Sequence, residues 1–361
     1  MTIDTVATAD TSLVIGDGAV AGLGDRMRAA GLAGRAFVIT DARVAEHCAA
    51  PVVRALEAAA YRPELLAVEG GESAKSLGRA GELFAWLAGH RAERRDCVVA
   101  LGGGVIGDLA GFVAATYLRG VPLVQVPTTV LAQVDSSIGG KTAVNLPQGK
   151  NLVGAFYLPR LTLIDVALLA GLPPRELRSG WAEVIKTAAI FDAPLFEDLE
   201  ATPVATMSRP RLLETIDRCV RWKVRIVEED PRERGRRILL NFGHTIGHAI
   251  EAAAAYGGYL HGEAVSIGMV GAGEISRRLG MIDASLVERL RRVLQANELP
   301  LSYARRLAGP EAIMRAAASD KKVEGARLRW VLLSGLGQTA VRDDVPLDLV
   351  RDVVDSLGAA E

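Results

Sequence analysis

The chain has 361 residues, with 42 lysines and arginines against 43 aspartates and glutamates, so its formal net charge is -1. A nearly neutral chain lacks the long-range attraction of nucleic-acid and membrane-surface proteins, and an aromatic content of 5% is too low for binding by base stacking. Cys48, Cys97 and Cys219 are widely spaced and form no disulfide or zinc pattern. The sequence shows no signal peptide and no apolar run of membrane-spanning length, so we expect a cytoplasmic globular protein that binds neither nucleic acid nor membrane.

Short apolar runs alternate with helical patterns over the first half of the chain. Residues 35–41, 64–70, 96–104 and 122–129 predict strands, and 74–90 and 105–118 carry apolar residues at helical spacing. This alternation is typical of βαβ units and predicts a Rossmann-like parallel sheet. Long Ala/Leu/Arg/Glu patterns follow, and Pro173-Pro174 suits a first helical turn. We therefore predict an α/β domain over 1–172, an all-α domain over 173–361, and an active site in the cleft between them.

A glycine-rich turn follows the strand at 96–104. Gly102, Gly104 and Gly107 form a GxGxxG spacing where the next helix begins. The backbone N–H groups of such a turn and the helix N-terminus can hold a pyrophosphate. The acidic residue that binds ribose in the standard fingerprint is missing, so a plain strand-to-helix turn is the alternative.

Two further candidates for nucleotide binding follow neighbouring strands. Asp41 ends the strand at 35–41 and either binds ribose or caps the next helix. Glu72 and Lys75, in the loop GGESAKS, either face the same ligand or belong to a plain loop.

The stretch at 126–156 is dense in small, amide and cationic residues. Glycines precede Lys141 and Lys150, and glycine beside lysine lets backbone and ammonium groups face one anion. We therefore favour an anion site here over a solvated loop. The polar residues of the stretch are Thr128, Thr129, Asp135, Ser136, Ser137, Lys141, Asn145, Lys150 and Asn151.

Three of the five histidines, His244, His248 and His261, lie in one short segment. The four-residue spacing puts His244 and His248 on one helix face, and a double-glycine turn can fold His261 back toward them. This grouping predicts a divalent metal site, with separately hydrogen-bonded helix histidines as the alternative. The HxxxH spacing lacks the glutamate of zinc proteases. The carboxylate ligands that spacing leaves open are Glu183, Glu251 and Glu263.

The segment at 218–241 is rich in basic residues with interleaved acids. Most of these side chains fit a solvated helix face. Lys223 lies between apolar neighbours and Arg237 leads directly into the histidine segment, so these two are candidate ligands of an anionic group.

Six motifs together resemble the 3-dehydroquinate synthase family: LGGGVIGDLAGFVAATYLRG, VPTTVLAQVDSSIGGKTAVN, QGKNLVGAF, LPPRELRSGWAEVIK, NFGHTIGHAIEA and LHGEAVSIGM. The resemblance runs from about residue 35 to residue 322. It implies conversion of 3-deoxy-D-arabino-heptulosonate 7-phosphate to 3-dehydroquinate and phosphate in the shikimate pathway. It also implies catalytic NAD+, a zinc or cobalt ion, and a homodimer.

The resemblance also implies roles for individual residues. Glu183, His244 and His261 correspond to metal ligands, so His248 belongs with the substrate instead. The phosphate-end group corresponds to Lys141, Asn151, Asn241, His248, Lys321 or Lys322, and Arg119 of a second subunit. Arg237 and Lys223 correspond to holders of the carboxylate and ring hydroxyls, and the other polar site positions are Asp135, Lys150, Lys186 and Glu233. The NAD-binding set is Asp41, Glu72, Lys75, Gly103, Gly104, Asp108, Thr128, Thr129, Lys141 and Lys150. One departure is Gly171, near the adenine side, where the family often has threonine.

Three other functions are alternatives. A related cyclase acting on sedoheptulose 7-phosphate or an aminated substrate shares the nucleotide and metal parts but tends to alter positions such as Asn241 and His248, which are unaltered here. An NAD- and metal-dependent polyol dehydrogenase lacks the VDSSIGGKTAVN and GKNLVGAF blocks. A nucleotide-binding regulator without catalysis would not retain all the metal and anion residues.

Overall fold

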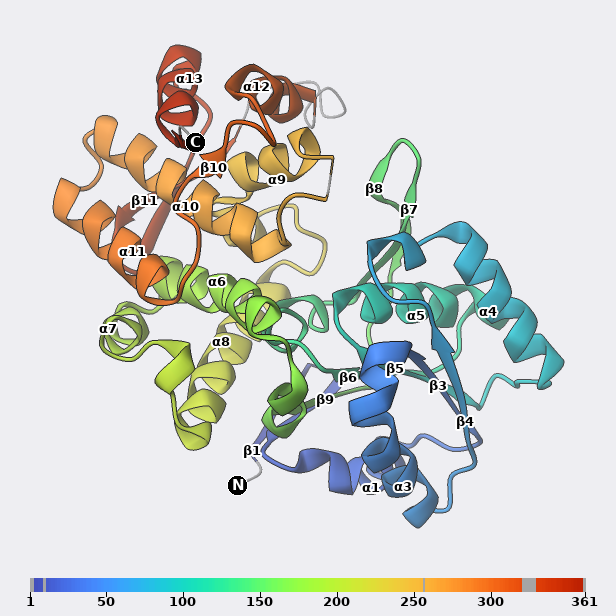
Figure 1. The fold of residues 1–361 in the computed structure, drawn as a ribbon. Helices are drawn as coiled ribbons and strands as arrows, with labels where there is room; N and C mark the ends of the chain where they lie inside the picture. The colour runs from blue at the N-terminus through green and yellow to red at the C-terminus, as the bar shows by residue number, and fades with distance from the viewer. Residues whose placement is uncertain (1–2, 9–10, 256, 320–328, 360–361) are drawn as a thin grey trace. The chain divides into compact units, whose positions relative to one another are not determined.

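The computed structural model describes residues 3–8, 11–255, 257–319 and 329–359 (Figure 1). The chain packs into two compact units. The first combines Met1–Pro173 with Ile216–Arg232, and the second combines Pro174–Thr215 with Glu233–Glu361. The second stretch of the first unit lies beyond the expected boundary between residues 172 and 173. This stretch consists largely of helix α8 (Arg209–Glu229).

The first unit is built on a seven-stranded sheet with the order β1-β2-β9-β6-β5-β3-β4. Strand β1 pairs antiparallel with β2, and the other neighbours pair in parallel. The predicted α/β fold with a parallel sheet is therefore confirmed. The strands are β1 (Ile3–Thr8), β2 (Thr11–Gly16), β3 (Ala36–Asp41), β4 (Pro63–Val68), β5 (Cys97–Gly102), β6 (Leu123–Pro127) and β9 (Leu161–Asp165).

Helices cover both faces of this sheet, because the inner strands carry apolar side chains on each face. On β3, Val38 packs into the core with α1 and α3, and Phe37 and Ile39 pack into the core with α4 and α5. Such continuous apolar runs are typical of parallel strands buried on both faces. The helices are α1 (Leu23–Ala29), α2 (Ala42–Val44), α3 (Ala50–Ala58), α4 (Leu77–Gly89) and α5 (Gly104–Thr116), with the π-helical turn η2 (Ala45–Ala49) between α2 and α3.

A separate antiparallel hairpin, β7 (Lys141–Leu146) with β8 (Gly149–Phe156), occupies the polar stretch after β6. It projects from the first unit beside α5 (Figure 1). Short turns complete the unit: η1 (Ala19–Gly22), η3 (Glu72–Ala74), η4 (Tyr117–Arg119), η5 (Ala132–Ser136) and η6 (Val166–Gly171).

The second unit is mainly helical, as predicted, and α10 is its central helix. Its helices are α6 (Pro174–Phe191), α7 (Ala193–Ala201), α9 (His244–Ala253), α10 (His261–Arg278), α11 (Ala284–Ala296), α12 (Pro310–Ser319) and α13 (Leu347–Ser356), with the short turns η7 (Val204–Thr206) and η8 (Arg236–Asn241). It also contains an antiparallel hairpin, β11 (Trp330–Gly335) with β12 (Gln338–Arg342), and a short parallel pair, β10 (Tyr303–Ala304) with β13 (Gly358–Ala359). The second unit is therefore not purely α-helical. None of the helices in the described ranges is long and apolar enough to cross a membrane.

Candidate active site

The histidine cluster is built by three helices of the second unit. Helix α6 carries Glu183, α9 begins at His244, and α10 begins at His261. Gly262 allows α10 to start directly against α6, because a Cβ atom there would lie only 1.7 Å from the carbonyl oxygen of Ser179. The N–H of Gly262 donates to Ser179 Oγ at 3.1 Å and fixes this contact.

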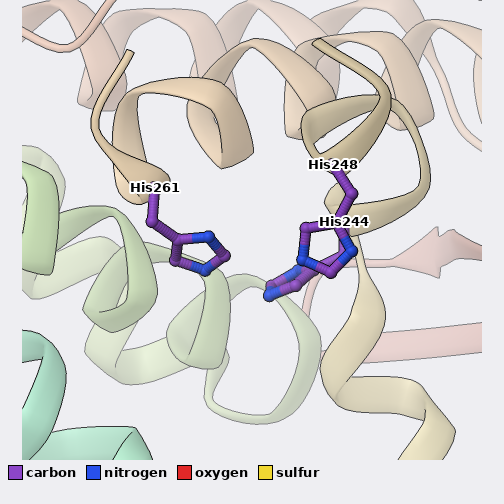
Figure 2. Close-up of side chains that lie close together, drawn as sticks. All are labelled: His244, His248 and His261. Carbon is purple, nitrogen blue, oxygen red and sulfur yellow. The ribbon is translucent and has the colours of Figure 1, made fainter. Parts of the chain in front are cut away.

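The three imidazoles face one another from α9 and α10 (Figure 2). Their ring centroids are 5.1 Å apart for His244 and His248, 5.2 Å for His244 and His261, and 5.7 Å for His248 and His261. One nitrogen from each ring lies within 4.8 Å of the others. This spacing is suited to side chains that share one cation or one anionic ligand.

Glu183 completes a set of donors for a divalent cation. Its Oε1 lies 3.6 Å from His244 Nε2 and 3.5 Å from His261 Nε2, and this buried oxygen has no hydrogen-bond partner among the described residues. The opposite ring nitrogens are engaged, His244 Nδ1 with the carbonyl oxygen of Phe242 and His261 Nδ1 with Glu251 Oε2, each at 3.2 Å. Nδ1 hydrogen bonds of this kind leave the Nε2 lone pairs for a metal. The donor set therefore fits a zinc-like ion.

The electrostatics of this cluster favour an ionised Glu183, a neutral His244 and a protonated His261, so a divalent ion would displace a proton from His261 on binding. Burial opposes ionisation of Glu183, but Lys186 and the histidines hold its pKa well below the usual value. Burial and the nearby Lys186 ammonium lower the pKa of His244 well below its usual value. Burial would lower the pKa of His261 too, yet the carboxylates of Glu183 and Glu251 raise it to about 10. Lys186 forms a buried ion pair with Glu183 one turn away on α6.

The structure separates the three glutamates that the sequence spacing left open. Glu183 lies among the Nε2 atoms, and Glu251 contacts the Nδ1 side of His261. Glu263 is used elsewhere: it accepts two hydrogen bonds from Arg175, at 2.6 and 2.7 Å, and one from the N–H of Leu260 at 2.9 Å. Glu263 therefore caps α10 and does not face the imidazoles.

The glycine-rich turn of the first unit forms the N-terminus of α5. Gly103 is the N-cap residue, and a Cβ there would lie 3.0 Å from Thr129 Cγ2. A Cβ on Gly104 would lie 3.1 Å from Ser136 Oγ, so both glycines allow the segment after β6 to approach the helix. Thr128 Oγ1 is buried here and has no hydrogen-bond partner among the described residues. The turn thus presents backbone N–H groups and a hydroxyl, which fits a pyrophosphate-bearing ligand.

Lys75 gathers several predicted residues around one buried ammonium group. Its Nζ donates to Asp108 Oδ2 on α5 and to Asn151 Oδ1 on β8. Burial raises the pKa of Asp108, although Lys75 acts in the opposite direction. Glu72 joins the group through Lys150, whose Nζ lies 3.9 Å from Glu72 Oε1. These five residues of the predicted nucleotide and anion sets therefore meet at one place in the first unit.

Asp41 caps a helix, as the alternative interpretation expected. Its Oδ1 accepts the N–H of Val44 at 3.0 Å. The helical turn η2 that follows borders a cavity of about 550 Å³, whose lining includes His47, Leu168 and Gly171. A Cβ on Gly171 would lie 3.7 Å from His47 Cβ, so the glycine keeps this wall of the cavity open.

Two further pairs connect predicted site residues. Lys223 on α8 forms an ion pair with Asp135 in η5, both in the first unit. Asn241 Nδ2 donates to Glu233 Oε1 at 3.5 Å in the second unit. Arg237 on η8 lies between Glu233 and Asn241 in sequence and is 1% exposed.

The remaining predicted phosphate-end residues are exposed or lie outside the described residues. Lys141 is exposed at the start of β7. Arg119 is exposed in a left-handed backbone segment, where φ is 50° at Leu118, 67° at Arg119 and 120° at Gly120. Lys321 and Lys322 lie outside the described residues.

Asn145 belongs to the polar stretch predicted to bind an anion but received no individual role, and the structure shows that it is well connected. Its side chain contacts both Glu72 and Asn151, at 2.7 and 2.9 Å. The polar stretch at 126–156 contained this residue, but spacing alone did not distinguish it from its neighbours.

The chain matches two family models, 3-dehydroquinate synthase N-terminal over residues 65–179 and 3-dehydroquinate synthase C-terminal over residues 180–323. A curated 3-dehydroquinate synthase from Synechococcus sp. is 43% identical over 351 residues, which cover 96% of this chain and 94% of that relative.

Two solved structures of sugar phosphate cyclases are similar over nearly the whole chain. A 2-deoxy-scyllo-inosose synthase complexed with carbaglucose-6-phosphate, NAD+ and Co2+ is 30% identical, with a TM-score of 0.87 and 99% coverage of both chains. A 2-epi-5-epi-valiolone synthase from Streptomyces hygroscopicus with NAD+ and Zn2+ bound is 28% identical, with a TM-score of 0.89 and 98% coverage of both. The family models, the curated relative and the fold agree, and the chain therefore belongs to the 3-dehydroquinate synthase family, which makes it a phosphate-eliminating, carbocycle-forming lyase.

Proposed function

We propose that this enzyme converts 3-deoxy-D-arabino-heptulosonate 7-phosphate to 3-dehydroquinate and inorganic phosphate, with NAD+ used catalytically. The observation that carries the metal-dependent chemistry of this proposal is the convergence of Glu183, His244 and His261 with both Nδ1 atoms already engaged. The choice of substrate is supported by the 43% identity to a curated 3-dehydroquinate synthase over nearly the whole chain. A divalent ion held by these side chains can bind vicinal hydroxyls of a polyol substrate.

The two cofactors have separate candidate sites. Glu183, His244 and His261 would hold a zinc or cobalt ion, and Gly103, Gly104 and the Lys75–Asp108 pair would hold NAD. When bound, NAD+ takes a hydride from a substrate alcohol and later returns it, and the metal ion polarises the substrate hydroxyls. The similar solved structures with NAD+ and Co2+ or Zn2+ support this assignment.

The chain's own residues hold the substrate ends. We assign the phosphate end to Lys141, Asn151, Asn241, His248, one of Lys321 and Lys322, and Arg119 of a second subunit. Arg237 and Lys223 hold the substrate carboxylate and ring hydroxyls, since a guanidinium binds a carboxylate through two parallel hydrogen bonds. Asp135 orients the Lys223 ammonium through their ion pair, and Glu233 orients the amide of Asn241.

Phosphate elimination does not require a dedicated strong base in this arrangement. Oxidation of the neighbouring alcohol to a ketone makes the adjacent C–H proton acidic, and the departing phosphate dianion can itself accept that proton. The protein then supplies geometry and positive charge, which lysine ammonium and asparagine amide groups provide.

Two other activities are alternatives to this one. A cyclase acting on sedoheptulose 7-phosphate shares the fold, but the curated relative is a 3-dehydroquinate synthase at 43% identity, above the 28–30% of the other cyclases. An NAD- and metal-dependent polyol dehydrogenase would release NADH in proportion to product. We further propose that the enzyme acts in the cytoplasm. We also propose that it is a homodimer, in which the exposed Arg119 of one subunit reaches the substrate of the other.

A substrate panel tests the proposal. Zinc-loaded enzyme with NAD+ is incubated separately with 3-deoxy-D-arabino-heptulosonate 7-phosphate, sedoheptulose 7-phosphate and glycerol, and inorganic phosphate and NADH are measured. We expect phosphate from the heptulosonate phosphate alone. Preferential release from sedoheptulose 7-phosphate would assign the related cyclase activity, and NADH formation with glycerol would assign a dehydrogenase.

A further inference from the structure

We propose that Asn145 is a positioning residue that couples dinucleotide binding to substrate binding. This inference rests on the proposed function, in which Glu72 and Lys75 bind NAD and Asn151 binds the phosphate end of the substrate. Asn145 touches both sets of residues, and no role follows for it from its place in the sequence.

The side-chain amide and the backbone N–H of Asn145 all have defined partners. Its Nδ2 donates to Glu72 Oε1 at 2.7 Å, and its Oδ1 accepts the N–H of Asn151 at 2.9 Å. Its own N–H donates to the carbonyl oxygen of Lys75 at 2.8 Å. One side chain on β7 is therefore tied to the loop around η3 and to β8 at once.

Lys75 closes these contacts into a ring. Its Nζ donates to Asn151 Oδ1 and to Asp108, and Lys75 is only 5% exposed. Asn151 itself has a φ of 58°, a left-handed conformation in which its N–H meets Asn145. The ring Glu72–Asn145–Asn151–Lys75 gives Glu72 and Asn151 a defined mutual position, so a ligand that fixes one of them also restricts the other.

An amide suits these two contacts, because its Nδ2 donates to a carboxylate while its Oδ1 accepts a backbone N–H. In an Asn145→Asp variant the acceptor for Asn151 is retained, but a second carboxylate faces Glu72 across the former 2.7 Å hydrogen bond. The variant therefore loses the hydrogen bond to Glu72 and keeps the one from the N–H of Asn151. Because coupling between two binding sites is reciprocal, its loss is measurable from either ligand.

The test uses the full-length zinc-loaded protein and two ligands. The NAD+ dissociation constant is measured by calorimetry with and without a phosphonate analogue of the substrate, in which a methylene replaces the bridging oxygen so that phosphate cannot leave. In the wild type we expect the analogue to tighten NAD+ binding about tenfold. In Asn145→Asp we expect that factor to fall to about one, with a smaller change in NAD+ binding to the analogue-free protein.

A rescue and a control separate positioning from a general effect on folding. Glu72→Gln alone keeps an acceptor for Asn145, and in Asn145→Asp/Glu72→Gln the introduced glutamine donates to the introduced aspartate, so the hydrogen bond is restored with its direction reversed. We expect the double variant to regain the coupling that Asn145→Asp loses. Leu152→Ala, on the same hairpin and 59% exposed, should leave the coupling unchanged.

The outcomes are distinct. Coupling that persists in Asn145→Asp, coupling that stays lost in the Asn145→Asp/Glu72→Gln double variant, or a wild type without coupling would each overturn the inference. A lower unfolding midpoint of the ligand-free Asn145→Asp protein with an unchanged coupling factor would show a structural role only and would also overturn it. A wild-type enzyme that releases no phosphate from the heptulosonate phosphate would instead contradict the proposed function.

Discussion

Glu251 is the residue whose contact with the histidine cluster is most easily tested. It is 6% exposed, and its Oε2 meets His261 Nδ1 at 3.2 Å. A carboxylate behind a metal-binding imidazole fixes the ring orientation, and its loss typically weakens metal binding about 10- to 100-fold. We predict this loss of zinc affinity for Glu251→Gln, measured by competition with a chromophoric chelator.

The matched control for this variant is Glu274→Gln on α10. Glu274 pairs with Arg277 and Arg278, which lower its pKa to about 2. It takes no part in the histidine cluster, so zinc affinity should be unchanged. Equal zinc affinity in wild type and Glu251→Gln would show that Glu251 does not position His261.

Lys141 tests the proposed handling of the leaving phosphate. Removing a preorganised positive donor from a developing anion costs about a hundredfold in turnover. We expect a fall of this size in kcat for Lys141→Ala, measured as phosphate release at saturating substrate. Unchanged turnover would exclude Lys141 from charge neutralisation in the elimination.

For individual residues, the sequence predicted the histidine cluster but not the position of each carboxylate. His244 and His248 are four residues apart, so helical geometry alone brings them together. Glu183 is 61 positions before His244 and reaches the cluster only through packing of α6 against α10. Sequence spacing carries no information on such a contact, and Glu263, equally plausible from spacing, instead caps α10.

Among the structural elements, the contact of α10 with α6 is the one that assembles the metal ligands. A Cβ on Gly262 would lie 1.7 Å from Ser179 O, so Gly262→Ala must push the helices apart. Overpacking of this kind typically costs about 1–3 kcal/mol. We predict a lower unfolding midpoint and weaker zinc binding for this variant, measured by calorimetry and chelator competition.

Gly273 provides a control on the same helix. A Cβ there would meet Leu290 Cδ2 at 3.5 Å, an ordinary contact, and alanine is the better helix former. Gly273→Ala should therefore keep both the unfolding midpoint and the zinc affinity. If Gly262→Ala behaves like Gly273→Ala, the close helix contact does not hold the ligands in place.

Asp96 links the starts of β3 and β5 and gives a pH-dependent prediction. Its carboxylate is 4% exposed and accepts the N–H groups of Arg35 and Glu93, both at 2.8 Å, and the Arg35 guanidinium at 3.0 Å. Burial alone would raise the pKa of Asp96, but these hydrogen bonds hold it below the ordinary value of 3.8. The carboxylate therefore stabilises the fold above about pH 4, and this contribution is lost as pH falls through the lowered pKa.

We predict that Asp96→Asn costs about 2 kcal/mol of folding free energy at neutral pH, because a charged acceptor is lost from buried donors. The difference between variant and wild type should shrink below pH 4. Urea unfolding at several pH values measures it. A difference that is constant down to pH 3 would contradict the assigned role of the charge.

The sequence predicted the buried central strands better than the half-exposed ones. β3 and β5 are continuous apolar runs bounded by polar residues, which made them recognisable. β7 and β8 were interpreted as an anion-binding stretch, because glycines and polar residues such as Asn145 and Asn151 obscure strand alternation. β11 holds four buried apolar residues in a row, a pattern that fits a helix segment as well as a strand.

At the scale of the whole molecule, the assigned residues divide between the two units. The first unit carries Lys75, Asp108 and Asn151, and the second carries Glu183, His244 and His261. The sequence predicted both the α/β and the helical parts. It did not predict that residues 216–232 pack with the first unit, because a helical pattern along α8 continues across the division.

The proposed reaction is an internal redox cycle, in which the hydride taken by NAD+ returns to the same substrate. The most direct measurement follows phosphate release and absorbance at 340 nm together, with zinc-loaded enzyme and NAD+ far below the heptulosonate phosphate concentration. For this cycle we expect many phosphates released per NAD+ and no net NADH. Phosphate release that stops at one equivalent of NAD+, or NADH that accumulates in step with product, would contradict an internal redox cycle.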